Sequence, residues 1–462
     1  MKNKFRLLLL FTLMLSTGTV FAQTSPKKTT VPTAARKPSA KAIPKGQEFK
    51  CFVQTSLSYS FSEQLAYIPP TETPVLPIVS KVYATQLFDV YVFFQNFAIK
   101  DNKTNVTFDV KVTGPRGRHF FGRKNLEGLV ISQKINAPNH VHLSPNIFRI
   151  SFNTSDPKGT YRINIKATDH ISGQETKTFT RITLLGGPPM FYKAVNFTPR
   201  EIGEFMCYYY LNPKPERLVP VFLGFCKICT DLRDEYPDFN HMALMAFFYR
   251  AFSMNKFLLP ALTNSAKDLP FSEKQHAVFL MHWMDTPYRP RLIAAMGPDA
   301  MQYDRTLDSC HNPFIIKQAR SSVQLDILWS LFFASGEFEP VFKILATMQL
   351  METGLKPEEL KRLKGVAPGT RSRIRDWIVG HSAEWSLKVN CRRHKLLRYY
   401  CEAVFADPET PPFIKYRLSK VLGIKYKMPS KHFPGSKPSL NVNIRKADFR
   451  KTLSLNRDQD KK

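Results

Sequence analysis

The feature that most constrains the fold is a run of mostly apolar residues from Ser322 to Met348. Its first half has almost no polar face, which is typical of a helix surrounded by other helices. Gly336 can end that helix because glycine adopts the left-handed conformation without a Cβ penalty. Pro340 suits the first turn of a second helix. The run therefore predicts a helical hairpin at the centre of an all-helical domain.

Helical patterns with short connections surround this hairpin. Thr198-Pro-Arg-Glu201 combines a capping box with a proline at the first helical position, so it predicts a helix start. Weak periodicity from Pro298 to Ala319 predicts a loop. No repeat of fixed length is found, so the prediction is an irregular bundle or a degenerate α-solenoid. The predicted helices span 199–211, 215–233, 238–253, 255–266, 272–284, 287–296, 321–334, 338–350, 357–364, 370–405 with a break, and 411–422.

The preceding part of the chain alternates apolar and polar residues with period two. Thr104 to Thr113 places four apolar residues on one face, and Thr160 to Thr168 repeats the pattern. Further strands are predicted at Val82 to Phe97, Ile147 to Phe152 and Thr176 to Leu184. About seven strands separated by turns predict an immunoglobulin-like β-sandwich.

One turn supports this interpretation. Asp156-Pro-Lys-Gly-Thr-Tyr161 resembles the corner of immunoglobulin-like and fibronectin-type domains, where a tyrosine begins a late strand. The cysteine pair of antibody domains is absent, because Cys51 is the only cysteine before Cys207. The resemblance implies a bacterial sandwich module rather than an antibody domain.

The two ends of the chain are basic. Residues 1–22 combine a positive start, an apolar run and small residues ending at Ala22, which predicts a cleavable secretory signal peptide. Residues 23–47 and 425–462 predict a disordered basic linker and a disordered basic tail. Of the formal charge of +30, residues 1–46 and 425–462 supply +17. We therefore expect a β-sandwich over 48–187 and an all-helical domain over 197–424, separated by the glycine and proline residues of 184–189.

The cysteines raise a redox and a metal hypothesis. Cys226 and Cys229 have thioredoxin-like spacing, but they lie late in a helical pattern with no preceding strand. A zinc site could join them with Cys391 and His394, although two arginines lie between the latter two. An oxidising compartment favours disulfides, and a bond from Cys207 to Cys226 or Cys229 would link adjacent helices. Burial among apolar residues is the alternative for Cys226 and Cys229.

The most basic ordered surface is predicted on the long helical pattern near the carboxyl end. Its candidates for contact with an anionic partner are Arg371, Arg373, Arg375, Arg392, Arg393 and Arg398. The clustered aromatic residues 208–210, 377, 385, 399 and 400 could line a groove for sugars or peptides, or could belong to the core. Asp326 is the exception in the apolar hairpin. We expect it to tether two helices rather than to act as a catalyst, with Arg320 or a nearby helix cap as its partner.

A resemblance is carried by Leu325-Asp-Ile-Leu-Trp-Ser-Leu-Phe-Phe-Ala-Ser-Gly336. This run resembles a Leu-Asp-x-Leu-Trp-x-x-Phe-Phe-Ala-Thr-Gly signature in a loosely defined group of uncharacterised secreted or periplasmic bacterial proteins. Ser335 replaces the usual threonine, and residues 383–390 look similar too. The resemblance would cover residues 200–424 and implies no catalytic residues.

Together these patterns predict an exported, periplasmic or secreted bacterial protein. We expect a non-catalytic binding or scaffolding module that contacts a protein or an anionic envelope component, including the membrane surface. No small-molecule cofactor is expected, because no phosphate-binding loop, dinucleotide motif or metal-binding histidine pair is present. The alternatives are an envelope enzyme, either a thiol oxidoreductase or a hydrolase of sugar polymers, or a secreted factor that binds host membrane or nucleic acid. Export argues against nucleic acid as the physiological partner.

Overall fold

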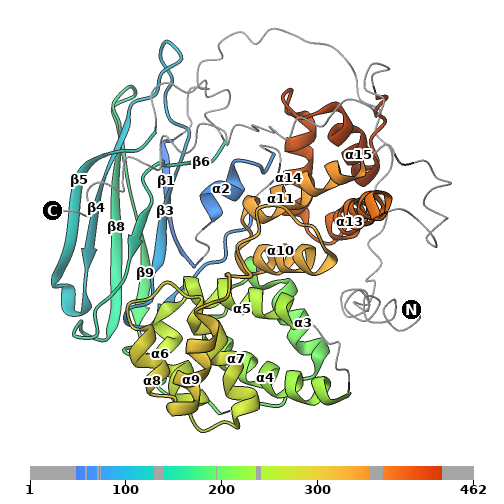
Figure 1. Cartoon of the computed structure of the whole chain (residues 1–462). Helices are drawn as coiled ribbons and strands as arrows, with labels where there is room; N and C mark the ends of the chain where they lie inside the picture. Colours follow the sequence, from blue (N-terminus) through green and yellow to red (C-terminus); the bar gives the residue numbers. More distant parts are fainter. Residues whose placement is uncertain are drawn as a thin grey trace. The chain divides into compact units, whose positions relative to one another are not determined.

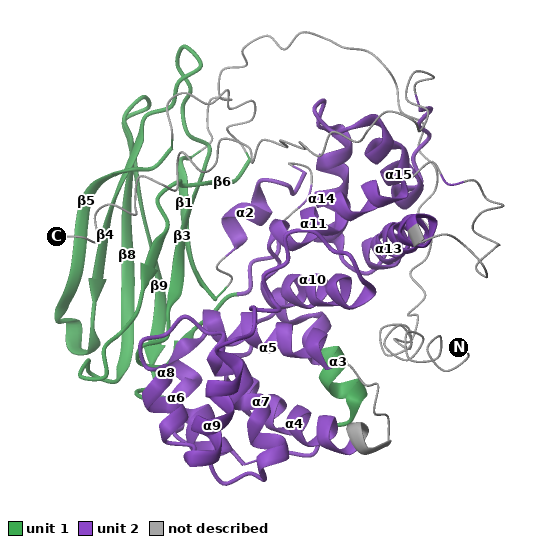
Figure 2. Cartoon of the chain, viewed as in Figure 1, with its two compact units in different colours: residues 1–57, 78–188, 197–204 green, residues 58–77, 189–196, 205–462 purple. Residues whose placement is uncertain are grey.

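The computed structural model divides the chain into two compact units (Figures 1 and 2). It describes residues 48–57, 60–69, 72, 74–129, 140–193, 195–235, 241–352, 355 and 368–428. The first unit, here called the β unit, groups residues 1–57, 78–188 and 197–204. The second, the helical unit, groups residues 58–77, 189–196 and 205–462. The chain therefore combines β-sheets and many helices in a multidomain α and β architecture.

The β unit contains two sheets. The first has the order β1-β3-β6, and β7 also pairs with β3; the second has the order β2-β9-β8-β4-β5. The strands are β1 (Lys50–Ser56), β2 (Lys81–Val82), β3 (Phe88–Gln95), β4 (Val106–Thr113), β5 (His119–Glu127), β6 (His142–Leu143), β7 (Phe148–Ile150), β8 (Gly159–Asp169) and β9 (Gln174–Leu184). β1, β5 and β6 lie outside the individually predicted strands.

Both sheets contribute to one hydrophobic core. It contains Phe49, Val90 and Phe94 from the first sheet region and Val110 and Ile163 from the second sheet, all buried. The period-two pattern produces this arrangement, because alternate residues of β4 and β8 point to the same face.

The helical unit contains the predicted hairpin. α10 (Ser322–Ser335) ends at Gly336, which has the left-handed conformation with φ of 69°. α11 (Phe338–Thr347) follows directly. The structure thus confirms the turn that the glycine predicted, and the apolar residues of α10 are buried, including Leu328 and Phe332.

Apart from α2 and α9, where no helix was predicted, the remaining helices largely follow the predicted ranges. They are α2 (Phe61–Leu65), α3 (Pro199–Cys207), α4 (Leu218–Glu235), α5 (Met242–Met254), α6 (Leu259–Ala266), α7 (Phe271–His282), α8 (Arg289–Ala294), α9 (Pro298–Leu307), α13 (Pro368–Cys391), α14 (Lys395–Ala406) and α15 (Pro412–Leu422). Short 3₁₀ segments are η1 (Pro115–Gly117), η2 (Tyr209–Leu211), η3 (Pro215–Arg217), η4 (Lys256–Leu258) and η5 (Met348–Met351). The predicted break in 370–405 falls between α13 and α14. The signal peptide, the linker to residue 47, the helix at 357–364 and the tail beyond residue 428 lie outside the described residues.

Two expectations are corrected by the structure. The loop predicted from Pro298 contains helix α9, which starts at that proline after Gly297. Its buried residues Ala300 and Leu307 are seven positions apart and lie on the same face of the helix. Its short length and polar residues hid the periodicity. Residues 58–77, expected within the sandwich, belong to the helical unit. There the hydroxyl group of Ser60 donates a 2.6 Å hydrogen bond to the carbonyl oxygen of Ser335.

Among the described residues, no helix combines the length and the apolar character needed to cross a bilayer.

Candidate functional site

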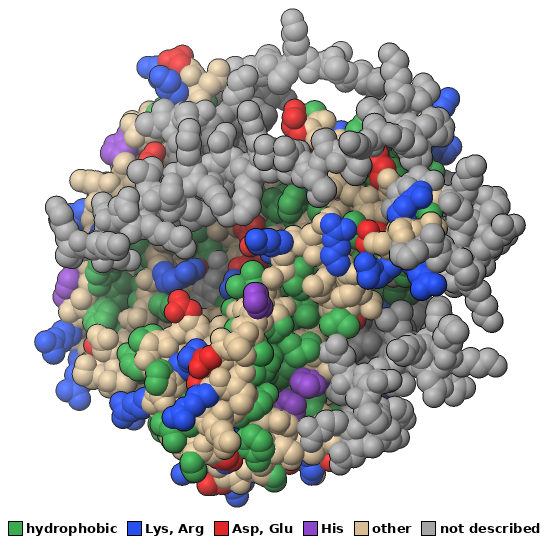
Figure 3. Space-filling model, viewed as in Figure 1, with side chains coloured by type: hydrophobic (Ala, Val, Ile, Leu, Met, Phe, Trp, Pro, Cys, Tyr) green, Lys and Arg blue, Asp and Glu red, His purple; other side chains and the backbone are tan. Residues whose placement is uncertain are grey.

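A groove in the helical unit brings together part of the predicted basic surface. It lies between the start of α10 and residues 371–382 of α13 and has a volume of about 420 Å³. On the face shown in Figure 3, Lys and Arg side chains gather where Figure 1 draws α13 and α14. The groove is lined by Arg320, Ser321, Ser322, Arg371, Ile374, Arg375, Ile378, Val379 and Ser382.

Helix α10 contributes its amino-terminal end to this groove. Ser321 is the N-cap, and its side chain accepts a 3.3 Å hydrogen bond from the backbone N–H of Gln324. The Gln324 side chain in turn accepts a 2.7 Å hydrogen bond from the backbone N–H of Arg320. These reciprocal contacts fix the start of the helix, where the helix dipole produces a positive potential.

Helix α13 contributes the arginines and the apolar floor. Arg371 and Arg375 are four residues apart, so their side chains leave the same face of the helix. Ile374 and Val379 are buried, whereas Ile378 is 49% exposed. The groove therefore joins positively charged edges to an apolar surface.

The local charge balance is positive. One guanidinium nitrogen of Arg320 lies 3.7 Å from a carboxylate oxygen of Asp376. A guanidinium N–H of Arg375 donates a 3.4 Å hydrogen bond to the hydroxyl oxygen of Ser372. With three arginines among the lining residues and no acidic residue among them, the groove favours a negatively charged group.

The other predicted basic residues lie elsewhere. Arg373 is exposed on α13 but does not line the groove. Arg392 and Arg393 follow the far end of this helix, about 28 Å from Arg373 at 1.5 Å per residue. Arg398 is on α14 and pairs with Glu402 across 2.8 Å. The six arginines thus do not form a single surface.

The predicted partner of Asp326 is wrong. Arg320 contacts Asp376 instead, and none of the described residues forms an ion pair with the carboxylate of Asp326. Burial alone raises the pKa of this carboxyl group to about 7. Asp326 is therefore not a tether between helices.

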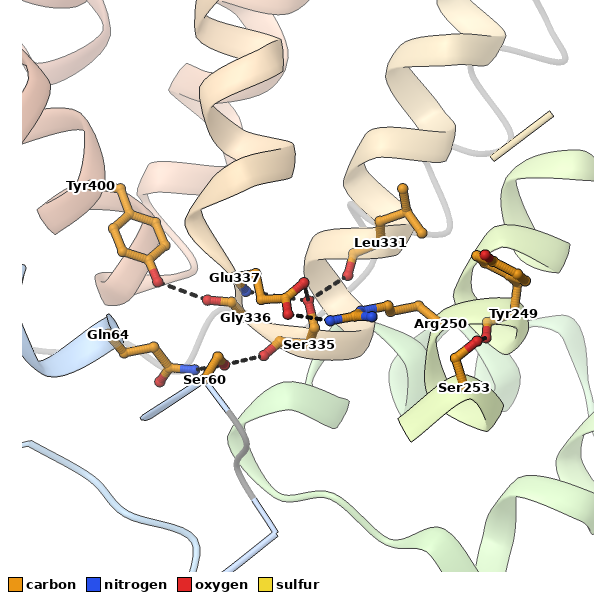
Figure 4. A network of polar contacts seen from close by, with 10 residues as sticks. All are labelled: Ser60, Gln64, Tyr249, Arg250, Ser253, Leu331, Ser335, Gly336, Glu337 and Tyr400. Carbon is orange, nitrogen blue, oxygen red and sulfur yellow. Dashed lines mark hydrogen bonds and ion pairs between the residues drawn. The ribbon is translucent and has the colours of Figure 1, made fainter. Parts of the chain in front are cut away.

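The hairpin turn is held by polar contacts that the sequence did not reveal (Figure 4). The side chains of Arg250 and Glu337 form an ion pair, and Ser335 donates a 3.1 Å hydrogen bond to the carboxylate of Glu337. The hydroxyl group of Tyr400 donates a 2.7 Å hydrogen bond to the carbonyl oxygen of Gly336. These contacts satisfy the polar groups of a turn inside an apolar core, so their role is structural.

The cysteines do not form the predicted redox site. Cys226 is fully buried, and its burial together with the neighbouring Cys229 raises the pKa of its thiol well above the ordinary value. A nucleophilic thiolate requires the opposite shift. No disulfide links the seven cysteines, all of which are described, so the predicted bond from Cys207 to Cys226 or Cys229 is absent.

The zinc set does not assemble either. Among the described residues, no group of three or more His, Cys, Asp or Glu side chains is placed to hold a metal ion. His394 instead forms a 3.0 Å hydrogen bond between its Nδ1 atom and the hydroxyl group of Tyr210. The thiol of Cys391 contacts the sulfur of Cys401 at 3.6 Å. These side chains are parts of the core.

Three of the seven candidate aromatic residues are in the core. Tyr209, Tyr210 and Tyr400 are buried, whereas Tyr208 and Trp385 are each 47% exposed. None of the seven lines the groove between α10 and α13.

Comparisons with known proteins do not identify the chain. No family model and no curated protein matches it. Among solved structures, it resembles part of a family 123 glycoside hydrolase from Clostridium perfringens, in a study of glycolipid glycan hydrolysis. The identity is 10%, the TM-score is 0.22, and the match covers 40% of this chain and 36% of that chain. The chain thus matches less than half of that hydrolase, and so weak a likeness establishes neither a shared fold nor a shared function.

Proposed function

We propose that this protein is a non-catalytic binding protein that holds an anionic ligand in the groove between α10 and α13. The observation that carries the proposal is the presence of Arg320, Arg371 and Arg375 on the edges of one groove. Arginine binds carboxylate, sulfate and phosphate groups through paired N–H donors. The amino-terminal end of α10 adds to the same positive potential.

The floor of the groove indicates a second property of the ligand. Ile374, Ile378 and Val379 offer an apolar surface beside the arginines. A ligand with an acidic group and an apolar part would satisfy both halves, because it would remove the exposed side chain of Ile378 from water. We therefore infer an amphiphilic anion rather than a small inorganic ion.

The competing enzymatic functions have less support. A thiol oxidoreductase needs an accessible thiolate, whereas Cys226 is buried with a raised pKa. A hydrolase of sugar polymers needs two facing carboxyl groups. The residues that line the groove include no acidic side chain, so a binding role is the better proposal.

For the β unit we propose an immunoglobulin-like sandwich. The hydroxyl group of Tyr161 donates a 2.9 Å hydrogen bond to the backbone carbonyl oxygen of Pro157, four residues upstream. This contact supports the tyrosine-corner interpretation. For the helical unit we propose an irregular bundle or a degenerate α-solenoid. We also propose that this unit is related to the secreted or periplasmic bacterial proteins whose signature the α10 sequence resembles.

We further propose export, followed by contact with a protein or an anionic component of the cell envelope. The support is the signal-peptide pattern that ends at Ala22 and the basic residues at both ends of the chain. Contact with host membrane or nucleic acid remains the alternative for these basic ends.

The binding experiment compares dodecyl phosphate, dodecanol and inorganic phosphate by titration calorimetry below the micelle concentration. We expect dodecyl phosphate to bind at least about tenfold more tightly than either control, because only it uses both the arginines and the apolar floor. The variant R371Q/R375Q should lose about tenfold in affinity. The control variant R373Q/K388Q removes the same charge from the same helix outside the groove and should bind like the wild type. Equal losses in the two variants, or no preference for dodecyl phosphate, would overturn the proposal.

A further inference from the structure

The outer face of the second sheet of the β unit carries a concentration of cations. The side chains of β8 alternate, so Tyr161, Ile163 and Ile165 are buried while Arg162 and Lys166 point to the opposite face. In β9, Arg181 and Lys177 share the same outer face. Lys111 of β4 joins them, because it pairs with Asn164 of β8.

The cations face each other across neighbouring strands. Arg162 lies directly opposite Arg181, and Lys166 lies directly opposite Lys177. Like charges in directly opposite positions destabilise an antiparallel sheet. Of these four, only Lys166 has an ion-pair partner among the described residues, at 2.8 Å from Glu175. Two such pairs on one face indicate a surface that is arranged to meet negative charge.

One aromatic ring orients the two arginines. The guanidinium carbon of Arg162 lies 3.8 Å from the centroid of the Phe179 ring, and that of Arg181 lies 4.8 Å from it. Such cation–π contacts hold the guanidinium planes against the ring. The N–H edges are then pre-organised to bind a planar or tetrahedral acidic group without a large loss of side-chain entropy.

Neutral hydrogen-bonding groups lie between the cations. Thr160 and Thr183 share this face next to Arg162, with their hydroxyl oxygens 3.3 Å apart. Thr113 pairs with Arg162 on the other side, and Asn164 lies between the two cation pairs. Together with Lys111, these residues give a surface of hydroxyl, amide and cationic groups that extends about 14 Å along β8 between the two cation pairs. Two carboxylates share this face, Glu175 of β9 and Asp109 of β4, which pairs with Lys166. The five cations of β4, β8 and β9 on this face therefore outnumber its two acidic groups.

We propose that this face of β4, β8 and β9 binds an acidic polysaccharide, with Arg162 and Arg181 contacting a carboxylate or sulfate group and the threonines contacting sugar hydroxyl groups. The proposal does not depend on the groove in the helical unit.

The composition of the face favours a glycan over other polyanions. Single-stranded nucleic acid gains much of its affinity from bases stacked on open aromatic rings. Here the ring of Phe179 is already engaged by two guanidinium groups. Insertion into a membrane requires exposed apolar side chains. Apart from Phe179, the side chains named above on this face are all polar, so hydroxyl-rich acidic chains fit best.

The test measures binding of the whole protein to immobilised polygalacturonate, heparin and neutral dextran at 150 mM salt. The first two distinguish a carboxylate from a sulfate as the acidic group. We expect R162Q/R181Q to weaken binding to the preferred polymer by about tenfold or more. The control variant K50Q/K103Q removes two exposed cations of the same unit outside this face and should change binding by less than about twofold.

A third variant separates orientation from charge. F179L keeps every cation but removes the ring that positions the arginines, so we expect binding to weaken by about threefold or more. An unchanged affinity of F179L, or equal losses in the two charge variants, would show that only general electrostatic attraction operates and would overturn the proposal. Failure to bind either acidic polymer would overturn it as well. So would equal or tighter binding of single-stranded DNA or of phosphatidylserine vesicles through the same two arginines.

Discussion

The hydroxyl group of Tyr400 in α14 donates a 2.7 Å hydrogen bond to the carbonyl oxygen of Gly336, the residue that ends α10. Both residues lie in the helical unit, 64 positions apart in the sequence. Through this contact the polar end of a helix is satisfied inside an apolar core. The pairing makes the turn of the hairpin part of the tertiary packing rather than a surface connection.

Removal of this donor should destabilise the protein. Tyr400→Phe leaves a buried carbonyl oxygen without the hydroxyl partner, so we expect the free energy of unfolding to fall by about 1–3 kcal/mol. Chemical denaturation at neutral pH measures the change. Tyr208→Phe is the control, since Tyr208 is 47% exposed and its loss should cost less than about 0.5 kcal/mol. Equal effects of the two substitutions would contradict a role for the buried hydrogen bond.

Local patterns predicted much of this fold. The α10–α11 turn followed from Gly336 and Pro340, and the strands β4, β8 and β9 followed from alternation, because each signal lies within a few residues. Long-range pairings could not be read in this way. Ser60 and Ser335 are 275 residues apart, and no local pattern links them.

The candidate sites show the same division. Arg371 and Arg375 were recognised as basic residues on one helix, but their meeting with Arg320 depends on how α13 packs on α10. The cation pairs of β8 and β9 had a readable signal in the alternation of the two strands. Their significance required the register, which places Arg162 opposite Arg181.

Gly336 is itself open to a direct test. A Cβ atom at this position would lie 2.6 Å from Nε2 of Gln64 and 2.8 Å from Cδ2 of Tyr210, and φ is 69°. We expect Gly336→Ala to cost about 2–4 kcal/mol of stability, from left-handed strain plus the contacts. Gly423→Ala is a matched control, because Gly423 ends α15 with φ of 73° and nothing within 4 Å of its added Cβ atom. It should cost only about 1 kcal/mol. Similar losses in both variants would mean that the crowded contacts at Gly336 have no effect.

Asp326 should make stability depend on pH. Burial raises the pKa of its carboxyl group to about 7 in the folded protein, against about 3.9 when unfolded. Between these values the folded state binds more protons than the unfolded state, so this group lowers stability progressively as pH rises from about 4 to 7. Asp326→Asn removes this titration. Relative to the wild type, the free energy of unfolding of the variant should therefore rise by about 1–3 kcal/mol as the pH increases across that window.

The comparison also isolates Asp326 from a second buried group. Burial, helped by Arg393, lowers the pKa of His394 to about 4, which decreases stability as pH falls below about 6.5. The wild type and the Asp326→Asn variant both retain His394, so the contribution of this histidine cancels in the difference between their free energies of unfolding. Urea denaturation at several pH values from 4 to 8 gives that difference. A difference that stays constant across the series would refute the buried ionisation of Asp326.

The opposed lysines of β8 and β9 predict that the outer face of this sheet is less stable than it could be. Lys177 lies directly opposite Lys166, which keeps its 2.8 Å contact with Glu175. Lys177→Thr removes one of two like charges and introduces a residue with high β-propensity, so we expect a gain of about 0.2–1 kcal/mol in the free energy of unfolding. The gain should shrink at high salt, where repulsion between exposed charges is screened.

Lys50→Thr provides the control. Lys50 pairs with the uncharged Gln95, so its replacement should give no gain that shrinks with salt. A loss of stability on replacing Lys177 at low salt would show that the paired cations do not repel. If the gain is observed together with weaker binding to an acidic polysaccharide, the lysine pair reduces folding stability in favour of binding, as expected for a surface arranged to meet negative charge.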